Sequence, residues 1–227
     1  MKRSPLETIQ AQLRLECIGF DPDGLLVRIP GSDPDEIAAV YLYEHRCGLR
    51  LYSRNDLPPR LRDQISVVPL EAPPQAGEAI RTENVLRPFN EIRAILARHL
   101  GGIQVAVFET YVFEQLPEQD QTRLVHAIST SSGECPRFVI EQGGRVVSAC
   151  CSVRENAEAA ECYTLTEEGH RRRGFGAMVT RAWGRHVLLS GKIPFYSHHA
   201  DNQASRALAA RLGLGWKFRV MIFTQAG

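Results

Sequence analysis

A turn rich in arginine and glycine carries the residues of this sequence best suited to bind a ligand. It spans 171–176 and reads RRRGFG, between an apolar run that predicts a strand over 161–166 and a helix predicted to run to Ser190. The first amides of a helix have no partner within the helix, and the helix start carries roughly half a positive charge. Glycine lets a ligand approach the backbone closely, and arginine stays charged. The turn therefore predicts a site for a phosphate or diphosphate.

Other glycine-rich phosphate loops fit this turn less well. A Walker loop ends in Gly-Lys-Ser/Thr, whereas Gly176 is followed by alanine and methionine, which excludes that loop. A Rossmann fingerprint needs a third small residue where Val179 stands and has no run of arginines, so it is disfavoured. The remaining pattern is Arg/Gln-x-x-Gly-x-Gly/Ala, which Arg171, Gly174 and Gly176 satisfy. A solvated basic helix start is the alternative reading.

The elements that must position the turn follow one another through the second half of the chain. Periodicity and turn residues predict strands over 104–113, 138–141, 145–152, 193–197 and 216–222, and helices over 116–129, 175–190 and 202–212. Asp201 or Asn202 can cap the last helix, and Gly191 and Gly213 stand where left-handed C-terminal caps belong. The strand before the turn and the helix after it are therefore expected to present the glycines together.

The first hundred residues read as a small α+β module. A helix is predicted near the N-terminus, followed by short strands and a hairpin over 38–52. A Pro-rich stretch over 71–77 is typical of a linker or surface loop. Apolar residues at helical spacing then predict a helix that ends at Gly101 and Gly102. We therefore expect a division near Gly101, into 1–101 and 102–227.

Composition restricts the function classes. The 227 residues carry a net charge of +1, which argues against general nucleic-acid binding. No apolar run approaches the roughly 18 residues of a membrane span, and the N-terminus lacks the apolar core of a signal peptide. Six cysteines without C-x-x-C spacing indicate reduced thiols in a cytoplasmic protein. His198, His199 and Asp201 lack a second ligand pair, so no metal is expected.

A second motif joins the first and carries a resemblance. Asn202-x-x-Ser205 opens a helix of small residues that ends in Leu-Gly-Leu over 212–214. With the arginine-glycine turn, this order resembles the GNAT N-acetyltransferase superfamily over about 104–227. The first hundred residues resemble the N-terminal extensions of some bacterial GNAT proteins. The resemblance implies an α/β (α+β) fold, in which a mixed, twisted sheet is split like a V and flanked by helices, after the small α+β module.

The resemblance also implies a cofactor, acetyl-CoA, and the residues that hold it. The pantetheine would lie against the end of the strand before the turn, and the diphosphate would lie on the turn. The residues that this implies are Thr164, Leu165, Thr166, Arg171, Arg172, Arg173, Gly174, Phe175, Gly176, Ala177, Asn202 and Ser205. Asn202 could instead be only a helix cap, and Ser205 only a small residue at a helix contact.

The implied reaction is transfer of an acetyl group to an amine of a small molecule or peptide by direct attack. A base must first deprotonate the ammonium. Glu161 is the first candidate, Tyr163 lies on the same strand face, and His199 or the neighbouring His198 is the second candidate. The tyrosine that many family members use as acid, seven positions after the asparagine, is Ala209 here.

That departure keeps a second reading open, a non-catalytic sensor or partner module that binds an acyl-CoA. On either reading the expected partners are acetyl-CoA and, for an enzyme, an unidentified amine acceptor. Neither nucleic acid nor a membrane is expected, and the chain could be a monomer or a homodimer.

Overall fold

The structure is a computed structural model, and it describes residues 3–16, 18–28, 38–70, 82–117, 124–128 and 136–226. The chain forms two compact units, Met1–Glu109 with Lys217–Gly227, and Thr110–Trp216. Strands β5 (Ile103–Val112) and β11 (Gly215–Gln225) contribute residues to both units. The predicted domain boundary near Gly101 stays a prediction, because compactness alone does not establish which segments fold independently.

The first unit is the expected α+β arrangement. Its helices and strands, besides parts of β5 and β11, are α1 (Pro5–Leu15), β1 (Ile18–Phe20), β2 (Leu26–Arg28), β3 (Val40–His45), β4 (Gly48–Ser53), α2 (Pro59–Ser66) and α3 (Thr82–Leu100). Its sheet has the order β4-β3-β11-β5. A capping box starts α1, in which Ser4 and Glu7 bond each other's backbone amides. Arg219 bridges Glu44 at 2.9 Å and Glu109 at 3.0 Å, which ties β3, β11 and β5 together.

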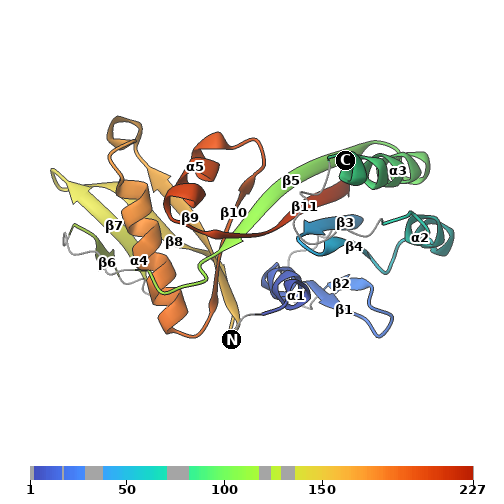
Figure 1. The fold of residues 1–227 in the computed structure, drawn as a ribbon, viewed down its shortest axis with the longest axis horizontal. Helices are drawn as coiled ribbons and strands as arrows, with labels where there is room; N and C mark the ends of the chain where they lie inside the picture. The colour runs from blue at the N-terminus through green and yellow to red at the C-terminus, as the bar shows by residue number, and fades with distance from the viewer. Residues whose placement is uncertain are drawn as a thin grey trace. The chain divides into compact units, whose positions relative to one another are not determined.

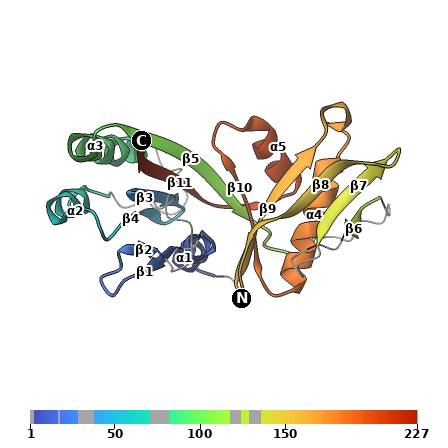
Figure 2. The same ribbon diagram turned by 180° about the vertical axis from the view of Figure 1, so that it is seen from behind.

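The second unit is a mixed sheet with helices against it. It comprises the end of β5, then β6 (His126–Ile128), β7 (Arg137–Gln142), β8 (Arg145–Glu155), β9 (Ala159–Thr166), α4 (Phe175–Leu189), β10 (Ile193–His199), α5 (Gln203–Arg211) and the start of β11. The strand order is β5-β10-β9-β8-β7-β6. Helix α4 lies across β7, β8 and β9 (Figure 1), and Figure 2 shows the same strands from behind. The predicted fold class is confirmed.

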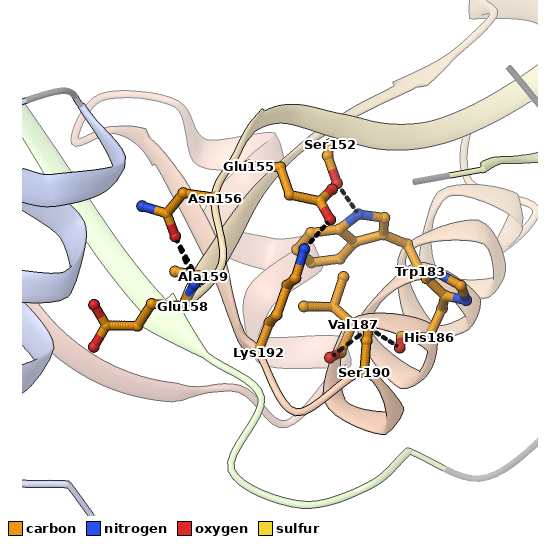
Figure 3. A network of polar contacts seen from close by, with 10 residues as sticks. All are labelled: Ser152, Glu155, Asn156, Glu158, Ala159, Trp183, His186, Val187, Ser190 and Lys192. Atoms are coloured by element: carbon orange, nitrogen blue, oxygen red, sulfur yellow. Dashed lines mark hydrogen bonds and ion pairs between the residues drawn. The ribbon is translucent and has the colours of Figure 1, made fainter. Parts of the chain in front are cut away.

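Helix α4 buries one apolar face against the sheet. Trp183 and Val179 are fully buried, and Phe175 and Val187 nearly so. Trp183 also donates a hydrogen bond from Nε1 to the Ser152 hydroxyl of β8, at 3.1 Å, as Figure 3 shows. This contact fixes the middle of the helix, and with it the place of the turn at its N-terminus.

Strands β9 and β10 pair only where they begin. Their parallel ladder joins Ile193 to Ala159, Pro194 to Ala160 and Phe195 to Glu161, and the described residues contain no further pair. Strand β9 remains paired with β8 on its other side as far as Thr166. The two strands therefore separate beyond the third pair, which is the split that the resemblance implied, and one edge of β9 is left without a ladder partner.

Contacts at the start of these strands hold the closed end of the split. The side-chain oxygen of Asn156 accepts hydrogen bonds from the amides of Glu158 and Ala159, at 2.8 and 2.9 Å, in the turn between β8 and β9. Lys192, just before β10, forms an ion pair with Glu155 at 2.6 Å (Figure 3). The side chains of two connecting segments thus fix the register at which β9 and β10 meet.

The helix predicted over 116–129 is wrong where the structure describes it. Leu116 and Pro117 are not helical, and His126–Ile128 form β6, paired antiparallel with β7. Residues 118–123 and 129 lie outside the described residues. The spacing of apolar residues in so short a segment fits either structure, and pairing with β7, distant in sequence, decides for a strand.

Candidate functional site

The turn before α4 has a backbone shape that gathers amide groups. Arg172 has φ 61° and Gly174 has φ 88°, both left-handed, whereas Arg173 between them does not have a positive φ. A backbone that alternates in this way points successive N–H groups toward one centre and forms an anion-binding concavity. A left-handed arginine is uncommon and costs free energy, so this conformation favours a ligand role for the turn.

The N-terminus of α4 also leaves amide donors open. Gly174 is the N-cap, and no described side chain caps the helix. The first hydrogen bond of the helix runs from the Met178 amide to the Gly174 carbonyl, at 3.1 Å. The amides of Phe175, Gly176 and Ala177 therefore have no acceptor within the helix. These donors and the concavity before them lie at the same end of α4.

Gly176 allows the turn to approach β9 closely. A Cβ at Gly176 would lie 3.2 Å from the Thr166 hydroxyl. The Thr180 hydroxyl donates to the Gly176 carbonyl at 2.7 Å and contacts the Thr164 hydroxyl at 2.8 Å. Arg171 donates from Nε to the Thr166 carbonyl at 3.2 Å. The start of α4 is thereby held against the end of β9 at several points.

A pocket of about 590 Å³ lies between the end of β9, the turn and α5. Eleven of the twelve predicted cofactor residues line it: Thr164, Leu165, Thr166, Arg171, Arg172, Gly174, Phe175, Gly176, Ala177, Asn202 and Ser205. Arg173 does not line it. The pocket begins where β9 and β10 have separated and ends at the open amides of α4.

The matched family decides the identity of this unit. Residues 133–222 match the family model described as GNAT acetyltransferase, and this segment contains the split strands, the turn and both helices of the pocket. Residues 133–222 thus belong to the GNAT superfamily. Membership of this family indicates acyl transfer as the class of chemistry.

Solved structures of several GNAT proteins are similar to this chain. A GNAT-family protein from Novosphingobium aromaticivorans has 15% identity and a TM-score of 0.46, over 55% of this chain and 66% of that one, just under two thirds of its length. A GCN5-related N-acetyltransferase-like protein from Streptococcus suis has 14% identity and a TM-score of 0.47, over 87% of this chain and 90% of that one. A GCN5-related N-acetyltransferase from Kribbella flavida has 13% identity and a TM-score of 0.45, over 98% of this chain and 95% of that one. No curated protein matches the chain significantly.

Arg211 is a pocket residue of this GNAT unit that the sequence did not single out. It is the last residue of α5 and lines the pocket together with Arg171 and Arg172. Its Nη2 lies 3.0 Å from the place of a Cβ on Gly174, so the guanidinium stands over the turn. The turn is therefore more positive than the RRR run alone suggested. A lone arginine at a helix end carries no local signal that could have shown this.

The hydroxyls of the threonines at the end of β9 are bonded within the protein, although both residues line the pocket. The Thr166 hydroxyl bonds the Ser148 hydroxyl at 2.8 Å, and the Thr164 hydroxyl donates to the Cys150 sulfur at 3.2 Å besides contacting Thr180. The backbone on the edge of β9 toward β10 has no ladder partner beyond Glu161 among the described residues and is left to bond a ligand. The described residues of the chain contain no group of side chains that could hold a metal ion.

Asn202 is the N-cap of α5, which is the alternative role that the sequence left open for it. Its side-chain oxygen accepts a hydrogen bond from the Ser205 amide at 3.0 Å, which starts α5. Both residues also line the pocket. Capping and ligand contact are thus compatible at this position, since the side-chain amide NH₂ is not needed for the cap.

The three predicted catalytic side chains share one face of the sheet, opposite α4. Thr164 of β9 contacts α4, so alternation turns Glu161 and Tyr163 away from that helix. Phe195 pairs with Glu161, and alternation along β10 then places His199 on the Glu161 face. Glu161 is buried in an ion pair with Arg154 at 2.8 Å, whereas Tyr163 is 57% exposed and His199 is exposed. None of the three lines the pocket.

His198 has a defined proton position. It is buried at 6% exposure, and its Nδ1 lies 2.8 Å from the His199 carbonyl oxygen. A carbonyl only accepts, so Nδ1 must carry the proton. Nε2 has no hydrogen-bond partner among the described residues. The ring packs between those of Tyr111 and Tyr196, with centroids 5.5 and 6.1 Å away.

We therefore expect nitrogen NMR of the labelled protein to show neutral His198 as the Nδ1-protonated tautomer. The assignment can be checked with His198→Gln, which removes only that signal. An Nε2-protonated His198 would contradict the placement of this ring against the His199 carbonyl.

Among the described residues, no helix is both long and apolar enough to cross a membrane.

Proposed function

We propose that this protein is an acetyl-CoA-dependent N-acetyltransferase that moves the acetyl group to an amine of a small molecule or peptide by direct attack. One observation carries the proposal: β9 and β10 separate after three residue pairs, and a pocket runs from there to the uncapped start of α4. A thioester on a long arm that ends in a diphosphate has the charge and shape that this pocket favours.

The residues of the turn suit the diphosphate. The amides of Phe175, Gly176 and Ala177 donate toward it, and Arg171 and Arg211 add charge that does not titrate. The pantetheine would bond the free edge of β9 as an added strand would. Bound in this way, acetyl-CoA supplies an activated acyl carbon to an acceptor at the split.

The acceptor is best placed on the other face of the sheet, where Tyr163 and His199 are exposed. An alkyl ammonium with a pKa near 10.4 must lose a proton before it can attack. His199 is the better base of the expected set, because its imidazole is exposed, whereas Arg154 holds the Glu161 carboxylate. Tyr163 would then contact the acceptor without taking its proton.

A non-catalytic acyl-CoA sensor is the second candidate. It is favoured by Ala209, which is fully buried where many GNAT enzymes have a tyrosine, and by the ion pair that engages Glu161. The two candidates share the cofactor and differ in turnover, so one pair of measurements separates them.

We expect calorimetry to show that the full chain binds acetyl-CoA with a dissociation constant in the micromolar range, because several amides and arginines meet one diphosphate. No binding at millimolar acetyl-CoA would exclude both candidates. A panel of amines, followed by release of free thiol, tests turnover. Thiol release that depends on an amine supports the enzyme, and binding without release by any amine supports the sensor.

A further inference from the structure

Tyr196 presents a poorly satisfied hydroxyl to the pocket. It is the first residue of β10 beyond the ladder with β9, and it lines the pocket. Its side chain is only 5% exposed, and its hydroxyl donates one long hydrogen bond, 3.4 Å, to the Ser205 carbonyl. A good O–H···O bond is about 2.7–2.8 Å long. This donor is therefore free to turn to a better acceptor at the point where the strands separate.

The hydroxyls of the two threonines at the end of β9 are engaged within the protein. Thr164 bonds Thr180 and Cys150, and Thr166 bonds Ser148. The arginines lie at the far end of the pocket, beside the start of α4. Tyr196 is thus a pocket residue whose weakly bonded hydroxyl stands where the two strands separate.

In the transfer proposed above, the atom that gains charge inside the split is sulfur. We propose that the Tyr196 hydroxyl donates a hydrogen bond to the sulfur of coenzyme A as it departs, and keeps its own proton. This inference rests on the proposed function, which places the thioester between β9 and β10. It also accounts for the absence of a tyrosine at Ala209, since Tyr196 and Ala209 belong to the same buried cluster.

The environment of Tyr196 explains why the proton stays. Burial raises the pKa of Tyr196 to about 12. An ordinary thiol has a pKa of about 8.5, so full transfer of the proton to the thiolate is unfavourable by more than about a thousandfold. The titratable groups that face this tyrosine are Cys150 of β8, Cys162 of β9, Tyr111 of β5 and His198 of β10. Interaction with the two thiols and with Tyr111 raises the pKa of Tyr196 further.

The step balances without another reactant. The ammonium first loses one proton to a base, and its nitrogen then forms a bond to the acetyl carbon. The bond from that carbon to sulfur breaks, the electron pair leaves with sulfur, and the nitrogen gives up a second proton. The thiolate, stabilised by the hydrogen bond from Tyr196, takes a proton from water after it departs. One proton is released overall for each acetyl group transferred.

An acceptor is not needed to test this. Coenzyme A bound to the full chain is titrated by its thiolate absorbance, for the wild type and for Tyr196→Phe. A hydrogen bond to the charged sulfur favours the thiolate, so the acid dissociation constant of the bound thiol should be about 10- to 100-fold larger in the wild type than in Tyr196→Phe. Tyr52→Phe, which removes a hydroxyl from β4, should match the wild type. Equal constants for wild type and Tyr196→Phe would overturn the proposal.

A second measurement uses only the wild type, should the variant fail to fold. Carbon-13 NMR of labelled tyrosine reports on the Tyr196 ring carbon that bears the hydroxyl. At a pH where the bound thiol is ionised, that signal should shift with coenzyme A and not with desulfo-coenzyme A, while remaining that of a neutral phenol. The same signal with both ligands, or a phenolate signal, would contradict the proposal. Failure of both ligands to bind would overturn the proposed function together with this inference.

Discussion

Gly174→Ala is expected to raise the dissociation constant for acetyl-CoA about 100-fold. Gly174 has φ 88°, where an alanine costs roughly 1–2 kcal/mol. The backbone can relax only by turning the peptide planes on either side, which moves the amides of the turn and of Phe175 away from their common centre. A Cβ there would also lie 3.0 Å from Arg211 Nη2 and would displace that guanidinium.

The size of this effect follows from the bonds that would be lost. A hydrogen bond to a charged group contributes about 1.5–3 kcal/mol, and two weakened bonds account for roughly 3 kcal/mol, or about 100-fold in affinity. Calorimetry with acetyl-CoA measures this loss of affinity directly.

Gly191→Ala is the matched control for this variant. Gly191 follows the C-terminus of the same helix, has φ 77°, and a Cβ there would meet nothing within 4 Å. The same backbone strain is therefore introduced at the end of α4 away from the pocket. Affinity should remain that of the wild type. Equal losses of affinity in both variants would mean that the stability of α4, and not the geometry of its first amides, determines binding.

Trp183→Ala is expected to lower the free energy of unfolding by about 4 kcal/mol. Trp183 is 0% exposed and has the largest volume of the fully buried side chains that the structure describes. Its ring packs edge-on against Phe113, with centroids 6.4 Å apart, and its Nε1 bonds Ser152. Removal of the indole leaves a cavity and an unpaired hydroxyl between α4 and β8. Urea denaturation followed by circular dichroism measures the change.

Companion variants separate packing from hydrogen bonding at this contact. Ser152→Ala removes the acceptor alone and should cost about 1 kcal/mol. Leu189→Ala, on the same helix but 66% exposed, should change stability by less than about 0.5 kcal/mol. A Trp183→Ala protein as stable as Leu189→Ala would show that α4 is not held to the sheet by this residue.

The helices around the pocket could be predicted from the sequence because their signals are local. Met178, Val179 and Trp183 recur at helical spacing, and Gly191 ends the helix with the left-handed conformation that such a glycine predicts. Asn202 starts α5 with its own side chain. Each of these features depends on residues within about one or two turns of the chain, and the structure confirms them.

The errors and omissions lie where distant segments meet. The residues of β6 were predicted to be helical, because nothing in their own spacing reports the pairing of His126–Ile128 with Arg137–Val139. Arg211 and Tyr196 enter the pocket from elements whose approach to the turn has no local signature. The left-handed backbone at Arg172 was likewise not expected, since arginine has no preference for that conformation.

The sequence by itself determined the strand, the glycine turn and the helix, and thereby the predicted diphosphate site, because glycine conformation and helix periodicity act over a few residues. Only the tertiary structure decided where β9 leaves β10, which side chains share the pocket and which face the other side of the sheet. Those outcomes depend on the register of strands far apart in the chain, and register is set by packing that no single segment encodes.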